Sequence, residues 1–402
     1  PSIQGNINVE EGRINGRLIG DVDLNSDFNS DQNRFDTNVR VYTDPEKYAG
    51  YIEANDGIGQ DLRLNGYIKI PEEQTRPEDE LFYFDADLRE IDLWIVEFIV
   101  PNIVTSMQGR GEGTGFISGS RTDFDFNSDF TVEEAVGTPF FTNVEYQLGG
   151  EMNFNKSDGL TFNEVRLTDH RGGTGRLTGI VDLNNFQPGT TMNLTIDLNN
   201  LQFMNNTYDP DVPFYGTMYG TGQAQITGSN TNPFLRTNGA VSISPDSRIS
   251  VPLQEETEFE QDRRFIQFVD TFDLSILEER LRQQAEQDAE NGSSNEELTF
   301  IELFTMDMQF TADNPINVQL IFDPVTNDIL NANGTGQVRI LLEDQDVSMF
   351  GRFNIQGGDY QFVSGDIFTR RFTLEEGGSI SWQGDLIDAG LDVTAIYRAR
   401  PV

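Results

Sequence analysis

Apolar and polar residues alternate with a period of two through most of this 402-residue chain. In TMNLTIDL, residues 191–198, the apolar side chains occupy every second position. The stretches FTMDMQF at 304–310 and INVQLIF at 316–322 repeat the pattern. A period of two is typical of strands with one buried and one solvated face. The chain is therefore expected to be all-β, with one apolar side on each strand.

Glycine-bounded strand units recur along the chain without a strict period. Examples are GRLIGDVDL at 16–24, GRLTGIVDL at 175–183 and GTGQVRIL at 334–341. Glycine marks turns, and the 30 phenylalanines suit the pleated, half-buried surface of a sheet. Such recurrence favours an elongated stack of strands over a catalytic scaffold with one special loop.

The charge balance restricts the partners. With 67 acidic and 27 basic residues, the net charge is −40, which repels phosphate backbones and excludes nucleic acid as a partner. The only lysines are Lys47, Lys69 and Lys156, and this acid-rich, lysine-poor balance resembles that of proteins from very salty habitats. The chain has no cysteine, so it has neither a disulfide nor a thiolate metal site.

Two stretches interrupt the alternation. Residues 89–107 are apolar nearly all round between Ile91 and Val104, which predicts a short buried or interfacial helix ended or kinked by Pro101. This helix is expected either to cover the apolar strand faces as a plug or to seal one end of the core. Residues 254–294 combine apolar positions at helical spacing with a charged Gln/Glu tract, which predicts a helical, partly mobile excursion.

Candidate catalytic and metal-binding residues are few. His170, the single histidine, is interpreted as a loop residue. Asp123, Asp125, Asn127 and Glu134 match positions of a calcium-binding loop, but Ser128 stands where the loop requires glycine, so a strand is favoured there. No cofactor, metal or enzymatic activity is predicted, although paired carboxylates acting on a polysaccharide remain an alternative.

Alternation alone leaves two architectures open. In a sandwich or closed barrel the apolar strand faces pack on each other. In a sheet curled into an open trough the apolar lining is covered by lipid chains. Both architectures require the same pattern of residues.

The stretch from Met349 onward distinguishes these architectures, because it resembles the C-terminal domain of the TamB family of bacterial envelope proteins, in a Bacteroidota-like form. FYGTMYGTGQAQITGS at 214–229 resembles the family's approach to that domain. The residues that carry the resemblance are Gly351, Gly358, Tyr360, Phe362, Phe372, Leu374, Gly377, Gly378, Ile380, Trp382, Gly384, Asp385, Leu391, Val393, Ala395 and Tyr397.

The resemblance implies an elongated, U-shaped "β-taco" with a continuous hydrophobic groove and few short helices. It implies a periplasmic protein, anchored in the inner membrane and reaching the outer membrane, that carries phospholipid and supports outer-membrane protein assembly. The implied protein partner is a BamA-like outer-membrane barrel protein. The anchor and the barrel-contacting segment are expected to lie outside this sequence.

The expected organisation has three parts. Residues 1–250 form the groove segment with the short helix near 91–107, residues 251–300 form the acidic excursion, and residues 301–402 form a truncated TamB-type C-terminal domain. The apolar strand positions expected to line the lipid groove are Met192, Leu194, Ile196, Leu198, Phe304, Met306, Met308, Phe310, Ile316, Val318, Leu320, Phe322, Val338, Ile340, Leu342, Phe353, Ile355, Phe372, Leu374, Ile380, Trp382, Leu391 and Val393.

Two other functions fit the same strand pattern. One is an extracellular β-helix or sandwich that binds or cleaves polysaccharide. The other is a chaperone that presents a strand edge to nascent outer-membrane proteins by β-augmentation. Lipid, carbohydrate and peptide binding distinguish the three.

Overall fold

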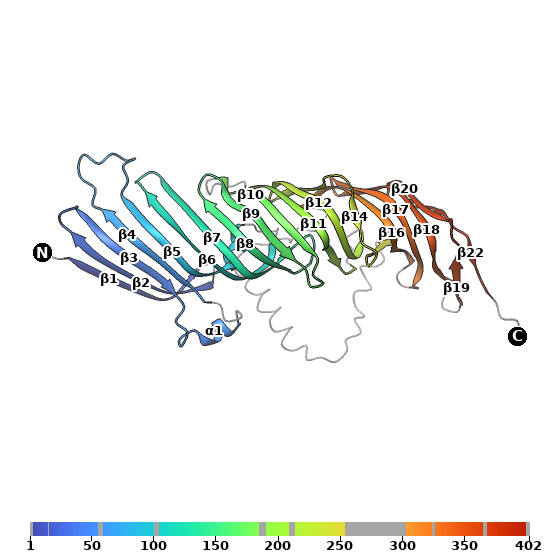
Figure 1. Ribbon diagram of the computed structural model, residues 1–402, viewed down its shortest axis with the longest axis horizontal. Helices are drawn as coiled ribbons and strands as arrows, with labels where there is room; N and C mark the ends of the chain where they lie inside the picture. Colours follow the sequence, from blue (N-terminus) through green and yellow to red (C-terminus); the bar gives the residue numbers. More distant parts are fainter. Residues whose placement is uncertain are drawn as a thin grey trace.

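The computed structural model describes residues 3–14, 16–54, 59–99, 104–184, 190–208, 214–253, 303–323, 326–364 and 368–398. Nearly all of the predicted excursion at 251–300 lies outside these ranges. The strands run across the long axis of the molecule, and the two chain ends lie at opposite ends of it (Figure 1).

The first part of the sheet is an antiparallel meander in which each strand pairs with the next. Its strands are β1 (Gln4–Ile14), β2 (Arg17–Asn29), β3 (Arg34–Tyr42), β4 (Asp61–Lys69), β5 (Phe82–Asp92), β6 (Val104–Gly119), β7 (Phe124–Pro139), β8 (Tyr146–Asn155), β9 (Gly159–Thr168), β10 (Thr174–Asp182), β11 (Thr191–Asn206) and β12 (Tyr215–Ser229).

The second part continues the same sheet, so that the described residues form a single sheet of 22 strands. Its strands are β13 (Asn232–Thr237), β14 (Val241–Ile243), β15 (Arg248–Pro252), β16 (Thr305–Asp323), β17 (Asp328–Glu343), β18 (Asp346–Ser364), β19 (Phe368–Leu374), β20 (Ser379–Asp385), β21 (Gly390–Asp392) and β22 (Ala395–Ile396).

The two parts join through three short strands. β13, β14 and β15 each pair antiparallel with β12 and parallel with β16, so together they take the place of one long strand. Parallel neighbours need a long connection, and residues 254–302 between β15 and β16 supply the length. Sequence alternation did not predict this parallel joint.

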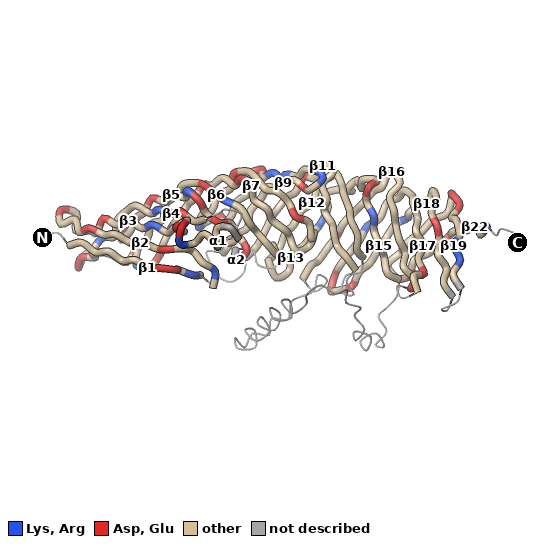
Figure 2. Tube along the Cα trace, turned by 90° about the horizontal axis from the view of Figure 1, so that it is seen from below, with Lys and Arg blue, Asp and Glu red and all other residues tan. Residues whose placement is uncertain are grey.

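The sheet is strongly curled. The rings of Phe203 on β11 and Phe310 on β16 stack with centroids 5.8 Å apart, and those of Phe141 and Phe304 are 5.7 Å apart. Phe141 lies in the turn before β8, and Phe304 directly precedes β16. In a flat sheet, β8 and β16 would be separated by roughly 29 Å, because six strand spacings of about 4.8 Å lie between them. The apolar face therefore folds over on itself, and the traces of the two walls cross in projection near β12 and β13 (Figure 2).

Glycines on the inner face permit this curl. Gly113 pairs with Phe130 across β6 and β7, and a Cβ on Gly113 would lie 2.1 Å from the Asp129 carbonyl oxygen. Gly336 pairs with Phe353 in the same way, and its Cβ would lie 2.3 Å from the Arg352 carbonyl oxygen. At both positions only glycine allows the neighbouring strand backbone to approach this closely, and a phenylalanine covers the gap.

The all-β prediction is confirmed, and so is the elongated curled sheet with few short helices. One continuous sheet replaces the two-sheet sandwich, and its strands pair antiparallel everywhere except along β16, where β13, β14 and β15 are parallel, which does not fit the all-parallel ladders of a parallel β-helix. The calcium-loop residues 124–134 lie on strand β7, and His170 lies exposed in the turn after β9, as interpreted.

The predicted helix near 91–107 is much shorter than its apolar run. It consists of a 3₁₀ turn, η1 (Leu93–Ile95), and one α-turn, α2 (Val96–Ile99), since β5 extends to Asp92 and β6 begins at Val104. Asp92 caps η1 by accepting a hydrogen bond from the Trp94 amide. The other helix is α1 (Ala49–Ala54), and no helix in the described ranges is long and apolar enough to cross a bilayer.

A buried carboxylate fixes the turn between β9 and β10. Asp169 is 5% exposed and accepts hydrogen bonds from the Arg171 amide at 2.8 Å, the Gly173 amide at 2.9 Å and the Gln202 amide on β11 at 2.7 Å. We expect Asp169→Ala to destabilise the protein by about 2–4 kcal/mol, because buried donors lose a charged acceptor. Urea denaturation followed by circular dichroism measures the loss.

Asp182→Ala is the matched control, because Asp182 is exposed and accepts only the Asn184 amide among the described residues. This control is expected to cost less than about 1 kcal/mol. Equal urea midpoints for the two variants would contradict the role assigned to Asp169.

Candidate functional site: an apolar interior with a polar recess beside it

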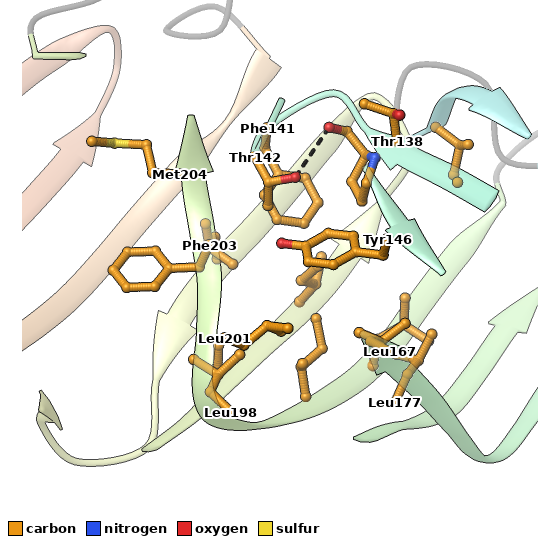
Figure 3. A pocket seen from close by; sticks show the side chains of 18 of the residues that line it. Thr138, Phe141, Thr142, Tyr146, Leu167, Leu177, Leu198, Leu201, Phe203 and Met204 are labelled. Atoms are coloured by element: carbon orange, nitrogen blue, oxygen red, sulfur yellow. Dashed lines mark hydrogen bonds between the residues drawn. The ribbon is translucent and has the colours of Figure 1, made fainter. Parts of the chain in front are cut away.

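The curl encloses an apolar cavity of about 190 Å³. Its walls come from α2 and from strands β6 to β17, and Figure 3 shows Leu167, Leu177, Leu198 and Leu201 grouped below the ring of Tyr146. No Asp, Glu, Lys, Arg or His is among the lining residues. Apolar cavities of this size stay dry and accept apolar guests.

Two polar groups in the cavity wall form hydrogen bonds within the protein. The Tyr146 hydroxyl donates to the Gln202 carbonyl at 2.8 Å, and burial raises the pKa of this phenol well above its usual range. The Thr142 hydroxyl donates to the Pro139 carbonyl at 3.3 Å (Figure 3). These groups offer no charge to a ligand, so the interior selects for apolar surface.

A second apolar cavity, of about 50 Å³, continues the interior toward the C-terminal end. It shares Met218, Ile249, Phe310 and Ile340 with the first cavity and reaches Trp382 on β20. A single cluster of buried apolar side chains extends from Leu93 to Leu386. The buried apolar cluster is thus continuous along the described strands between η1 and β20.

The structure brings most of the predicted lining residues together on the inner face. Twelve line one or both of the two cavities, namely Leu194, Ile196, Leu198, Met306, Met308, Phe310, Ile316, Val318, Val338, Ile340, Phe353 and Trp382. Nine others lie in the buried cluster or pack against it, namely Met192, Phe304, Leu320, Phe322, Leu342, Ile355, Leu374, Ile380 and Val393.

Two predicted residues lie apart from this cluster. Leu391 is 39% exposed on β21, and Phe372 contacts the rings of Tyr360 and Tyr397 at the end of the sheet. Sequence reasoning also omitted the β6–β10 wall, whose buried members include Met107, Met152, Leu160, Val165 and Leu167. The alternation in residues 146–167 was a usable signal for that wall.

The N-terminal end of the sheet is open. Ile7 and Val9 on β1 are 58% and 47% exposed, although they pair with Leu24 and Val22 of β2. The continuous buried cluster contains no residue from β1 to β5. Apolar surface therefore remains uncovered at this end, while the middle of the sheet is closed.

A polar recess of about 810 Å³ lies where the ends of β1 and β2 meet α1, η1, α2 and the start of β6. Figure 2 shows basic and acidic segments close together around α1, α2 and the end of β1. The ionisable carboxylates and cations that line the recess are Glu11, Arg13, Arg17, Lys47, Asp92 and Glu97.

The floor of the recess is tied to η1 and α2. Arg17 contacts Glu97 at 2.6 Å, and its guanidinium lies 5.4 Å from the centroid of the Trp94 ring. The other Glu97 oxygen accepts the Met107 amide at 3.0 Å. Burial raises the pKa of Asp92. Burial and the nearby Asp92 carboxylate raise the pKa of Tyr51 to about 12.

Asp21 holds the segment before α1 against β2. Its carboxylate, in a residue 6% exposed, accepts hydrogen bonds from Lys47 at 2.8 Å, from the Tyr48 hydroxyl and from the Glu11 amide at 3.1 Å. Burial raises the pKa of Asp21, but these hydrogen bonds and the Lys47 charge outweigh it, so the net pKa lies below its usual value. The folded protein therefore favours the ionised carboxylate.

A family model described as the TamB C-terminal domain matches residues 164–401, which is more than half of the chain and extends from within β9 past β22. No curated protein and no solved structure matches the chain significantly.

The Asp21 pKa predicts a pH dependence of stability. Because the folded pKa is depressed, Asp21 stabilises the protein fully above its unfolded pKa of about 3.9 and loses this contribution as the pH falls through the folded value. At pH 7 the wild type is expected to have a higher melting temperature than Asp21→Asn. The difference between the two melting temperatures should narrow below about pH 4. Thermal melts between pH 7 and pH 2.5 test this, and a gap that stays constant would refute it.

Proposed function

The chain belongs to the TamB family, and on that premise we propose that its curled sheet conducts the acyl chains of phospholipids across the periplasm. The family consists of non-enzymatic transport and assembly components associated with membranes. The finer assignment to lipid rests on one observation, the two overlapping apolar cavities that have no Asp, Glu, Lys, Arg or His in their linings and lie within a buried apolar cluster extending from η1 to β20.

The interior suits a weakly held hydrocarbon chain. An apolar cavity of roughly 150 Å³ accepts benzene, which has six carbons, so a cavity of about 190 Å³ holds roughly six chain carbons. At about 0.8 kcal/mol per buried CH₂, six carbons contribute roughly 5 kcal/mol before the entropy of ordering the chain is subtracted. This gain is large enough to hold a chain and small enough to release it.

The proposal extends to the setting of the protein. Phospholipid enters the groove at the inner membrane, where the protein is proposed to be anchored, and leaves it near a BamA-like outer-membrane barrel protein. The groove thereby supports outer-membrane biogenesis. The predicted lining residues are proposed as the lipid-contacting surface.

Phe310→Glu is the direct test. Phe310 is half-buried and lines both cavities, so a carboxylate there places a charge in an uncharged interior. We expect the purified variant to retain at most about one tenth of the phospholipid that co-purifies with the wild type. A tenfold loss requires only about 1.4 kcal/mol less binding free energy. Native mass spectrometry with lipid extraction measures the retention.

Phe350→Glu is the matched control, because Phe350 is 40% exposed on β18 and is absent from both cavity linings. A second variant, Ala224→Phe, fills the larger cavity without adding charge and covers the case in which Phe310→Glu does not fold. Equal lipid in folded Phe310→Glu, Ala224→Phe and Phe350→Glu would sink the proposal. Carbohydrate or peptide captured in place of lipid would favour the two other functions.

A further inference from the structure

We propose that the polar recess beside α1 and α2 binds the head group of a zwitterionic phospholipid, with Arg13 contacting the phosphate and Glu11 the ammonium. The inference rests on the proposed function, because it concerns the orientation of a lipid whose chains occupy the apolar interior. It adds a head-group site to an interior that has no charged group of its own.

The recess and the larger apolar cavity adjoin. Met107 lines both of them, and so do consecutive residues of α2, since Val96 faces the cavity and Glu97 the recess. The start of β6 divides in the same way, with Val104 on the apolar side and Thr105 on the polar side. An amphiphile at this boundary finds a polar volume of about 810 Å³ next to an apolar one.

Most charges in the recess already have partners. Lys47 contacts Asp21 and Glu10, and Arg17 contacts Glu97. Arg13, within the described part of the chain, donates a hydrogen bond only to the Gly16 carbonyl, at 3.0 Å. These contacts leave the Arg13 guanidinium as the cation of the recess that has no carboxylate partner among the described side chains.

Glu11 supplies the opposite charge. Its carboxylate takes part in no ion pair within the described ranges, while its backbone adopts a left-handed conformation with φ of 54°. This conformation is strained for a residue with a side chain, and it coincides with a break in the β1–β2 register between Val9 and Gly12. Bulges of this kind redirect side chains, and here both Glu11 and Arg13 line the recess.

Charge selects a zwitterion over an anionic lipid. The recess carries three cations and three carboxyl groups, and the chain as a whole carries −40, which disfavours a ligand with net negative charge. Arginine binds phosphate through two parallel hydrogen bonds, and a carboxylate pairs with a primary ammonium. Phosphatidylethanolamine presents both groups on one head.

The test loads the purified chain from micelles containing equal amounts of phosphatidylethanolamine, phosphatidylglycerol and diacylglycerol with identical acyl chains. Native mass spectrometry then counts each lipid retained. The wild type is expected to prefer phosphatidylethanolamine. Arg13→Glu should lower the ratio of phosphatidylethanolamine to diacylglycerol about tenfold, the effect of losing charge-assisted hydrogen bonds, and leave diacylglycerol retention unchanged.

Two further variants make the result specific. Arg121→Glu carries the same charge change on the exposed turn between β6 and β7, away from the recess residues, and should behave as wild type. In a Trp382→Phe background Trp94 is the sole tryptophan, and its emission should shift on adding phosphatidylethanolamine and much less on adding diacylglycerol. Glu11→Gln should narrow the preference for phosphatidylethanolamine over phosphatidylglycerol.

The outcomes separate the two proposals. If Arg13→Glu and Arg121→Glu retain phosphatidylethanolamine equally while diacylglycerol still binds, the head-group site is wrong and the conduit stands. If the wild type retains none of the three lipids, the conduit is wrong and the head-group site falls with it.

Discussion

The structure depends on covering the apolar face of one very long sheet. A sheet with one apolar face and no layer of helices must either meet another sheet or curl onto itself. The described strands curl, so that Phe203 on β11 stacks against Phe310 on β16. Glycines such as Gly113 and Gly336, each opposite a phenylalanine, remove the side chains that would keep the inner strands apart. The curl and the interior thus have the same cause.

The sequence predicted which residues form the inner face where the alternation was uninterrupted. Where the alternation was interrupted, it predicted fewer of these residues. Residues 191–198 and 304–322 alternate cleanly, and their apolar members lie in the buried cluster or pack against it. Leu391 belongs to the same pattern but is 39% exposed on β21, a strand of three residues that are all exposed. Periodicity identifies the face of a strand, whereas burial depends on what lies across from it.

The parallel joint and the polar recess depend on contacts between distant residues. β13 to β15 share one neighbour on each side, an arrangement that no local pattern of three short strands encodes. Glu11, Lys47 and Glu97 look like ordinary surface charges in the sequence and meet only after β1, α1 and α2 are placed. The apolar run at 91–104 predicted a helix in this region, but the predicted helix was too long. Hydrophobicity does not reveal that β5 continues to Asp92.

The separation of charge from the interior bears on how a conduit of this kind could discriminate among lipids. An interior lined by no Asp, Glu, Lys, Arg or His gains free energy in proportion to buried hydrocarbon and therefore treats lipids with the same chains alike. Discrimination must then arise at the rim, where a head group meets charged side chains. In the described part of the chain, the recess at α1 and α2 brings unpaired opposite charges next to the apolar cavity. Under the two proposals, selectivity and carriage reside in different parts of one sheet, so either can change without disturbing the other.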